Sequence, residues 1–170
     1  MAMELEFYLY DPSNARPVAP VSPVTGKRLD ADAVLSIDEL DDFGGFFRDI
    51  YAACEAQGVP ADSAIAENGI GQFEINLLHV DDPLRAADDA VLFKRIVRGL
   101  ARKHGFAASF MAKPYGERSG SGLHVHFSLL DRDGNNVFND GSADGSVLMR
   151  NAVGGLIEAM PETVLLFAPH

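Results

Sequence analysis

Strict alternation of apolar and polar side chains marks three segments of the chain, residues 3–10, 71–78 and 121–130. In the first segment the apolar positions are Met3, Leu5, Phe7 and Leu9, and the polar positions are Glu4, Glu6, Tyr8 and Tyr10. An alternation with period two predicts a half-buried strand, because successive side chains point to opposite faces of a sheet. We therefore expect three strands, each with one apolar face for helices to cover and one polar face.

Three other segments carry helix signals, and they cover residues 37–57, 82–104 and 146–160. The first follows a capping box, in which Ser36 and Glu39 satisfy free amides at the helix start. The second begins with Asp82 as N-cap and a proline in the first turn. The third is expected to end before Pro161, since proline disrupts a helix interior.

Two more strands are expected at 61–67 and 106–113. The first of them is joined to the strand at 71–78 by Asn68-Gly69, a dipeptide typical of tight two-residue turns. Residues 11–34 contain four prolines and read as a long excursion with a short hairpin at Thr25-Gly26. The order of strands and helices predicts an α+β fold, an antiparallel sheet with helices on its apolar face.

Composition narrows the class of protein. The chain has 170 residues, of which 47% are hydrophobic and 23% charged, a balance that excludes disorder over most of its length. A net charge of −11 repels phosphate backbones, so we expect no nucleic-acid partner. The single Cys54 cannot form an internal disulfide, and the sequence has neither a signal peptide nor an 18-residue apolar run. We expect a cytoplasmic protein with no membrane partner, and the abrupt ends suggest a piece of a longer chain.

The polar faces of the predicted strands carry the candidate chemistry. If these strands share one sheet, the side chains that converge are Glu4, Glu6, Glu74, His124 and His126, with Glu67 at a strand end within reach. Two carboxylates about 5 Å apart repel by roughly 3 kcal/mol at an effective dielectric constant near 20, so such a face needs cations. Oxygen-rich ligation with one imidazole suits Mg²⁺ or Mn²⁺.

Each of these groups also has an explanation that does not involve this metal site. Glu-x-Glu is common on solvated strand faces, and His-x-His occurs in many unrelated metal sites. The remaining histidines, His79, His104 and His170, are expected to have structural or surface roles; His104 ends a helix, where a cation is favoured.

Three blocks of sequence resemble the catalytic domain of the glutamine synthetase family. They are Glu4-Leu5-Glu6-Phe7, then the run from Ala66 to Glu74, then Met111-Ala112-Lys113-Pro114 followed by the run from Gly120 to Leu129. Their order and spacing agree over nearly the whole chain. The variants Gly-Gln-Phe-Glu-Ile-Asn at 71–76 and Phe-Met-Ala-Lys-Pro-Tyr at 110–115 are more similar to the γ-glutamylpolyamine synthetase branch.

The resemblance implies an ATP-dependent ligase that joins the γ-carboxylate of glutamate to ammonia or a polyamine through γ-glutamyl phosphate. It implies two ions of Mg²⁺ or Mn²⁺ per site, one held by Glu6, Glu67 and Glu74 and the other by Glu4 and His124. His126, Ser128 and Asp62 match nucleotide-contacting positions, and Gly120 matches a glycine that helps to hold glutamate. Ser119 departs from the family pattern, which commonly has Asn there.

The resemblance also sets expectations for the domain. Residues 1–170 would form one partial domain with a curved antiparallel sheet, without the family's β-grasp domain and without the C-terminal part of the catalytic domain. Such a piece is expected to be inactive, whereas the intact parent would be a ring-shaped homo-oligomer. The rival interpretations are a non-catalytic family member with a structural role and a stand-alone metal-binding module.

Overall fold

The computed structural model describes residues 1–14, 16–32 and 34–167, which divide into two compact units, Met1–His126 and Phe127–His170. The first unit contains β1 (Ala2–Tyr10), α1 (Ile37–Asp42), α2 (Gly44–Gln57), β2 (Ala61–Ala66), β3 (Gln72–Leu77), α3 (Pro83–Lys103), β4 (Ala107–Ser109) and β5 (Leu123–His126). The second unit contains α4 (Val147–Phe167).

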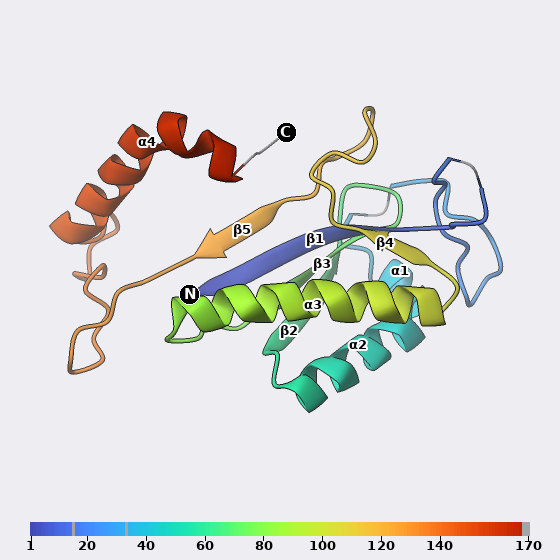
Figure 1. Ribbon diagram of the computed structural model, residues 1–170, viewed down its shortest axis with the longest axis horizontal. Coiled ribbons are helices and arrows are strands. Elements are labelled where there is room, and N and C mark those ends of the chain that lie inside the picture. Colours follow the sequence, from blue (N-terminus) through green and yellow to red (C-terminus); the bar gives the residue numbers. More distant parts are fainter. Residues whose placement is uncertain (15, 33, 168–170) are drawn as a thin grey trace. The chain divides into compact units, whose positions relative to one another are not determined.

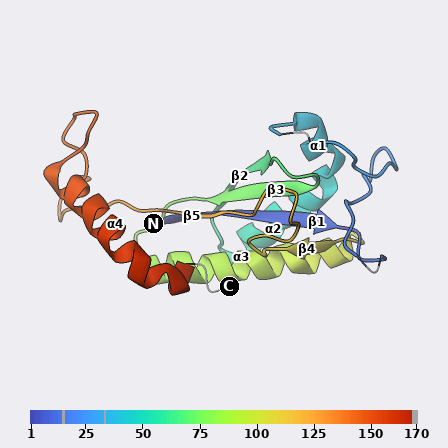
Figure 2. The ribbon, with the colours of Figure 1, turned by 90° about the horizontal axis from the view of Figure 1, so that it is seen from above.

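The five strands of the first unit form one open antiparallel sheet with the order β2-β3-β1-β4. The fifth strand, β5, pairs with the first half of β1, from Ala2 to Leu5, while β4 pairs with its last three residues. Both strands therefore lie along the same edge of β1 (Figures 1 and 2). This arrangement places β1 in the middle of the sheet, with β3 on its other side.

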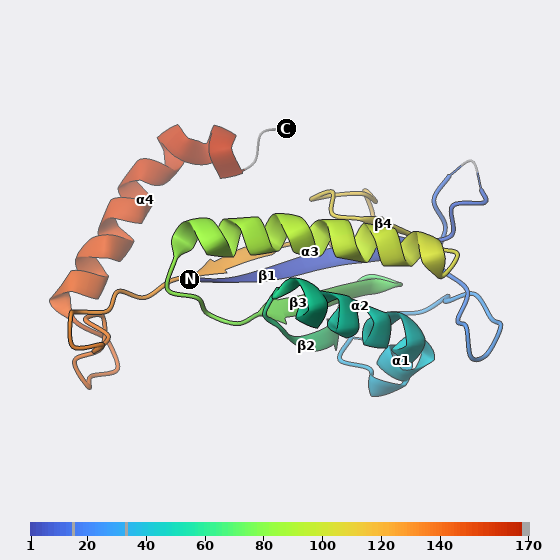
Figure 3. The same ribbon diagram turned by 60° about the horizontal axis from the view of Figure 1, so that its bottom comes forward.

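Helices α2 and α3 lie side by side across one face of this sheet (Figure 3). The apolar positions of the strands point towards them, and the buried core consists of side chains such as Leu5, Phe7, Leu9, Phe73, Ile75, Phe46, Ile50, Phe93 and Val97. Rings of Phe7, Phe73 and Phe93 pack with centroids 6.3 and 6.5 Å apart. The α+β prediction is confirmed, and the other face of the sheet carries the polar positions.

The helix expected at 37–57 is two helices. Phe43 separates α1 from α2 with a non-helical backbone (φ −101°, ψ 14°) and is fully buried against Phe73 and Phe106 at centroid distances of 5.4 and 5.5 Å. Gly44 and Gly45 follow directly, and glycine weakens a helix interior. The break therefore coincides with a buried ring and with two glycines. The predicted helix start is confirmed, since the Ser36 hydroxyl accepts a bond from the Glu39 amide at 3.1 Å.

The connection between β2 and β3 is longer than the two-residue turn expected at Asn68-Gly69. Glu67 N–H donates to the Gln72 carbonyl at 2.8 Å, which closes a loop of residues 68–71. The left-handed residue is Gly71 (φ 74°). At Gly69 the reason for glycine is different, because an added Cβ would lie 1.9 Å from the Tyr8 hydroxyl.

Strand β5 departs from the expectation that helices cover every apolar strand face. Only residues 123–126 form the strand, and Leu123 and Val125 remain 53% and 45% exposed. The strand expected at 106–113 is likewise shortened to Ala107–Ser109. Leu123 and Val125 stay exposed because β5 lies at the sheet edge, beyond the part of the sheet that the helices cover.

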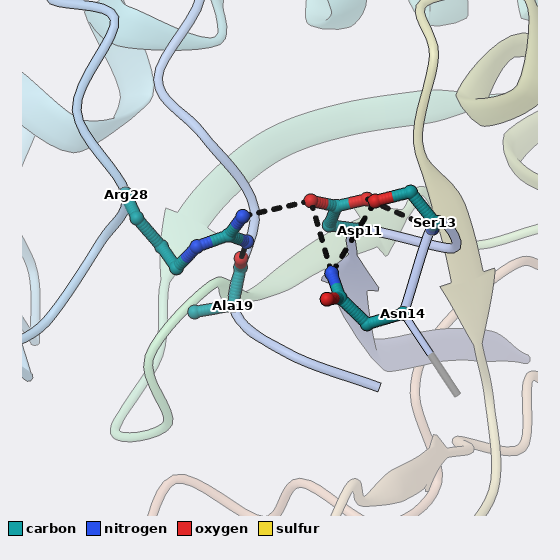
Figure 4. Close-up of polar contacts among 5 residues, drawn as sticks. All are labelled: Asp11, Ser13, Asn14, Ala19 and Arg28. Carbon is teal, nitrogen blue, oxygen red and sulfur yellow. Dashed lines mark hydrogen bonds and ion pairs between the residues drawn. The ribbon is translucent and has the colours of Figure 1, made fainter. Parts of the chain in front are cut away.

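The excursion at 11–34 forms two bridged turns, with isolated pairs Asp11↔Val18 and Val21↔Arg28. Figure 4 shows the polar contacts that hold it: Asp11 binds the Ser13 hydroxyl at 2.6 Å and the Arg28 guanidinium at 2.8 Å. These bonds from Ser13 and Arg28 lower the pKa of Asp11 to about 2. The contacts of Asp11 with Ser13 and Arg28 therefore hold this segment next to the end of β1.

In the second unit, Phe127 and Phe138 pack at a centroid distance of 6.0 Å, and the Ser146 hydroxyl donates to the Val137 carbonyl. The helix expected to end before Pro161 instead continues through it to residue 167. Two residues past the proline, the Thr163 hydroxyl donates to the Ala159 carbonyl at 3.0 Å. Among the described helices, none is both long and apolar enough to cross a bilayer.

Candidate functional site

The strand register gathers polar side chains from three strands on the face opposite the helices. Glu4 of β1 lies opposite His124 of β5 on one side and Asn76 of β3 on the other. Glu6 lies opposite Glu74. Directly paired residues of antiparallel strands project to the same face, so the convergence expected from the alternation is observed.

The centre of this face is a cluster of Glu4, Glu74 and His124, in which one candidate ligand atom from each residue lies within 4.8 Å of the other two. His124 Nδ1 is 3.0 Å from Glu4 Oε2. His126 Nε2 is 2.9 Å from the other oxygen of Glu4. Glu4 thus accepts from both imidazoles of the His-x-His pair, because these residues are two positions apart on one strand.

Burial, neighbouring charges and hydrogen bonds shift the pKa values of the carboxyl groups on this face. Burial raises the pKa of Glu74 to about 7, assisted by repulsion from Glu4, Glu67 and Glu6. Burial and then the charge of Glu6 also raise the pKa of Glu67. For Glu4, slight burial acts in the raising direction, but the bonds from His126 and His124 outweigh it and lower its pKa. Burial is thus the first cause of the raised pKa values of Glu74 and Glu67, and repulsion between the carboxylates adds to it.

Glu6 is fixed at the edge of this cluster. Its Oε2 accepts a hydrogen bond from Gln72 Nε2 at 2.9 Å. A Cβ added to Gly122 would lie 2.8 Å from Glu6 Oε1 and 3.3 Å from the ring of His124. A side chain at position 122 would therefore force the Glu6 carboxylate to shift from its present place.

These residues fit a hard divalent cation. The donor set is rich in carboxylate oxygens and contains an imidazole, which suits Mg²⁺ or Mn²⁺. Zinc favours more nitrogen or sulfur ligands. The raised pKa of Glu74 agrees, because an uncompensated carboxylate at that position is costly and a cation would relieve the repulsion.

The loop before β5 lies against the same face and is tied to the sheet. The Tyr8 hydroxyl donates to the Ser119 carbonyl at 2.7 Å, and Tyr115 packs edge-on against Tyr8 with centroids 5.1 Å apart. The Arg118 guanidinium lies 4.6 Å over the Tyr115 ring. Gly120 lies close to the backbone of Ala112, since an added Cβ would lie 2.8 Å from the Ala112 carbonyl oxygen.

Three further residues expected in the site are Asp62, Ser128 and Glu67. Asp62 is exposed on the outer strand β2, where its charge contributes to the raised pKa of Tyr51 on α2, after burial of that ring. Ser128 is half-buried in the second unit. Glu67 follows β2, half-buried and close enough to Glu6 for mutual repulsion.

Of the three remaining histidines, the two that the structure describes take no part in the cluster. His79 is exposed. His104 ends α3 with its Nε2 3.0 Å from Asp49 Oδ2, as expected of a structural residue. His170 lies outside the described residues.

Sequence reasoning missed the part played by Gln72 and Tyr8. Both lie opposite each other on the polar face, one step beyond Glu74 and Glu6, and both are at most 1% exposed. The alternation places Gln72 and Tyr8 on the same face as the carboxylates, and a buried amide or phenol there must have hydrogen-bond partners. Only the three-dimensional path of the loop at 115–122 shows which partners these are.

Comparison with known proteins places this geometry in a family. The family profile "Glutamine synthetase, catalytic domain" matches residues 1–170. The gamma-glutamylputrescine synthetase PuuA of Escherichia coli (strain K12) is 43% identical over 173 residues, covering 100% of this chain and 37% of that protein. The glutamate–isopropylamine ligase of a Pseudomonas species is 34% identical and covers 99% and 37%, respectively.

A solved structure agrees with the sequence relatives. Ligand-free GmaS matches with a TM-score of 0.78 at 30% identity, over 92% of this chain and 36% of that one. The chain spans little more than a third of the length of each of these proteins. The family profile and the match to PuuA both extend over the whole of this chain. The chain therefore belongs to the glutamine synthetase family, in its catalytic domain.

Proposed function

We propose that the natural protein is an ATP-dependent ligase that joins the γ-carboxylate of glutamate to an amine. An oxygen of that carboxylate attacks the terminal phosphorus of ATP and ADP leaves, forming γ-glutamyl phosphate. The amine nitrogen then attacks the acyl carbon, phosphate leaves and the nitrogen loses a proton. The observation that carries this proposal is the cluster of Glu4, Glu74 and His124 in a chain of this family.

Following the family resemblance, the carboxylate face would hold two ions of Mg²⁺ or Mn²⁺, one at Glu6, Glu67 and Glu74 and the other at Glu4 and His124. Glu74 is near both sets, since it clusters with Glu4 and His124 and its pKa responds to Glu67 and Glu6. When bound, such ions neutralise charge that develops on the transferred phosphoryl group and align its oxygens. The strands β1, β3 and β5 supply the rigidity that this alignment needs, since their register fixes four of these five side chains.

The remaining roles follow the same assignment. His126, beside Glu4, would contact the nucleotide phosphates together with Ser128, and Asp62 would contact the nucleotide elsewhere. The backbone at Gly120 would help to bind glutamate. The loop at 115–120 is suited to this role because Tyr8 and Gln72 anchor it to the sheet beside Glu6.

For the amine we propose putrescine or a similar polyamine. Support comes from the 43% identity to gamma-glutamylputrescine synthetase over the whole chain. A second relative acts, by its name, on isopropylamine, so amines larger than ammonia recur among the relatives.

The proposal extends to the protein as a whole. Residues 1–170 would form one partial domain that does not turn over alone, since the relatives have further sequence beyond this match. The natural protein would assemble into a ring-shaped homo-oligomer and act in the cytoplasm, where ATP and glutamate are available.

The test is amine-dependent release of phosphate from ATP and glutamate by the natural full-length protein. A panel of putrescine, isopropylamine, ethanolamine and ammonium would be compared. We expect strong stimulation by putrescine and little by ammonium. Stimulation by ammonium alone would overturn the polyamine assignment, and no stimulation by any amine would favour a non-catalytic role.

A matched pair of variants makes this assay sharper. Glu74→Gln removes a carboxylate from the cluster, whereas Glu55→Gln changes an exposed carboxylate on α2, on the helix side of the sheet. We expect the first to abolish turnover and the second to leave it unchanged.

A further inference from the structure

The side chain of Gln72 is almost completely buried on the polar face of the sheet, with 1% of its surface exposed. Its Oε1 accepts a hydrogen bond from the Gly69 amide at 2.9 Å. Its Nε2 donates to Glu6 Oε2 and to the Gly120 carbonyl, each at 2.9 Å. The amide thus uses its acceptor and both of its donor hydrogens, as a buried polar group must.

The three partners of Gln72 come from three separate segments. Glu6 belongs to β1, Gly69 lies in the loop that follows Glu67, and Gly120 lies in the loop that precedes β5. Each segment carries a group that the proposed function uses. One side chain therefore connects the Glu6 carboxylate with the loop that follows Glu67 and with the proposed glutamate-binding loop.

An amide is the only side chain of this size that matches all three partners. Glutamate at position 72 would turn a donor into an oxygen that faces the Glu6 carboxylate and the Gly120 carbonyl, and both contacts would become repulsive. Methionine has a similar length but provides no donor, so it would leave Glu6 Oε2 without this partner.

We propose that Gln72 is a positioning residue, which orients Glu6 towards the bound cation and holds the loop at Gly120 in place for glutamate. This inference rests on the proposed function. Gln72 acts through its partners and touches neither the cation nor the substrate. Groups that orient metal ligands in this way affect metal affinity by about 10- to 100-fold in other proteins.

Tyr8 provides a matched control within the same network. Its hydroxyl bonds the Ser119 carbonyl and so ties down the same loop, but the structure gives it no bond to Glu6. Tyr8→Phe therefore loosens the loop without releasing the carboxylate. Gln72→Met and Gln72→Glu release both.

The experiment compares the natural full-length protein with its variants Gln72→Met, Gln72→Glu and Tyr8→Phe. Mn²⁺ affinity is measured by electron paramagnetic resonance of the free ion, and loop order by amide hydrogen exchange at 115–122 without metal. We expect both Gln72 variants to bind Mn²⁺ about tenfold or more weakly and to exchange faster in the loop. Tyr8→Phe is expected to exchange faster but to keep the wild-type Mn²⁺ affinity.

The outcomes separate this inference from the function on which it rests. Failure of the wild-type chain to bind Mn²⁺ would overturn the proposed cation site. Wild-type Mn²⁺ affinity in the Gln72 variants, or an equal loss in Tyr8→Phe, would overturn the positioning of Glu6. Unchanged loop exchange in the Gln72 variants would overturn the inference whether or not the metal binds.

Discussion

Glu6 and Glu74 lie directly opposite each other on the antiparallel strands β1 and β3. Like charges at directly paired positions destabilise a sheet, and here further carboxylates lie nearby. A fold that needed only stability would place apolar or oppositely charged side chains there. The pairing therefore makes sense as a cation site, in which the bound ion reverses the sign of the interaction.

Glu74 makes the stability of the metal-free chain depend on pH. Its folded-state pKa, about 7, exceeds the ordinary value of 4.5, so the folded chain holds this proton more tightly than the unfolded chain does. Stability is therefore lost as the pH rises through that window. We expect Glu74→Gln to raise the free energy of unfolding at pH 8 by about 1–2 kcal/mol and to change it little at pH 4.5.

The measurement is urea unfolding with a chelator at both pH values, with Glu55→Gln as the control for loss of one exposed charge. A Glu74→Gln variant with a lower free energy of unfolding than wild type at pH 8 would instead identify Glu74 as a structural residue.

Gly122→Ala tests the close packing around Glu6. The new methyl group would lie 2.8 Å from Glu6 Oε1 and must displace that carboxylate or the ring of His124. We expect Mn²⁺ affinity to fall by about tenfold or more with the fold retained. Gly99→Ala on α3 is the control, because nothing lies within 4 Å of its added Cβ. Equal Mn²⁺ affinities of the two variants would contradict the packing argument.

Phe43→Ala tests how much the buried ring between α1 and α2 contributes to stability. The ring is fully buried between Phe73 and Phe106, so its removal leaves a cavity. The expected loss is about 3–5 kcal/mol in the free energy of unfolding, measured by urea denaturation. Val91→Ala, at a position that is 67% exposed, should change stability little. A loss as small as that of the control would contradict the burial of this ring.

Cys54 should be unreactive in the folded chain. It is buried on α2, and this burial raises the pKa of its thiol to about 11, so almost no thiolate exists near neutral pH. We expect no reaction with Ellman's reagent at pH 8 and stoichiometric reaction in denaturant. Rapid labelling of the native chain would show that α2 opens readily from the sheet.

Much of this site could be predicted from the sequence because a strand repeats every two residues. That period alone puts Glu4 with Glu6, and His124 with His126, on common faces. It does not say which strands are neighbours. The position of β5 beside the first half of β1, which gives Glu4 both imidazoles, depends on long-range pairing.

The wrong predictions share a physical cause. The break between α1 and α2 and the loop at Gly69 both involve contacts between residues that are distant in sequence. Phe43 packs against Phe73, and Gly69 lies against Tyr8. Local propensity contains no information about these contacts. The network of Gln72 belongs to the same class, since its partners Glu6 and Gly120 are 66 and 48 residues away.

The central claim is that the carboxylate and imidazole face binds divalent cations, and anomalous diffraction from crystals grown with Mn²⁺ tests it most directly. We expect an anomalous peak within ligand distance of Glu4, Glu74 and His124. Absence of a peak there, with Mn²⁺ found only at exposed acidic residues elsewhere, would contradict the claim.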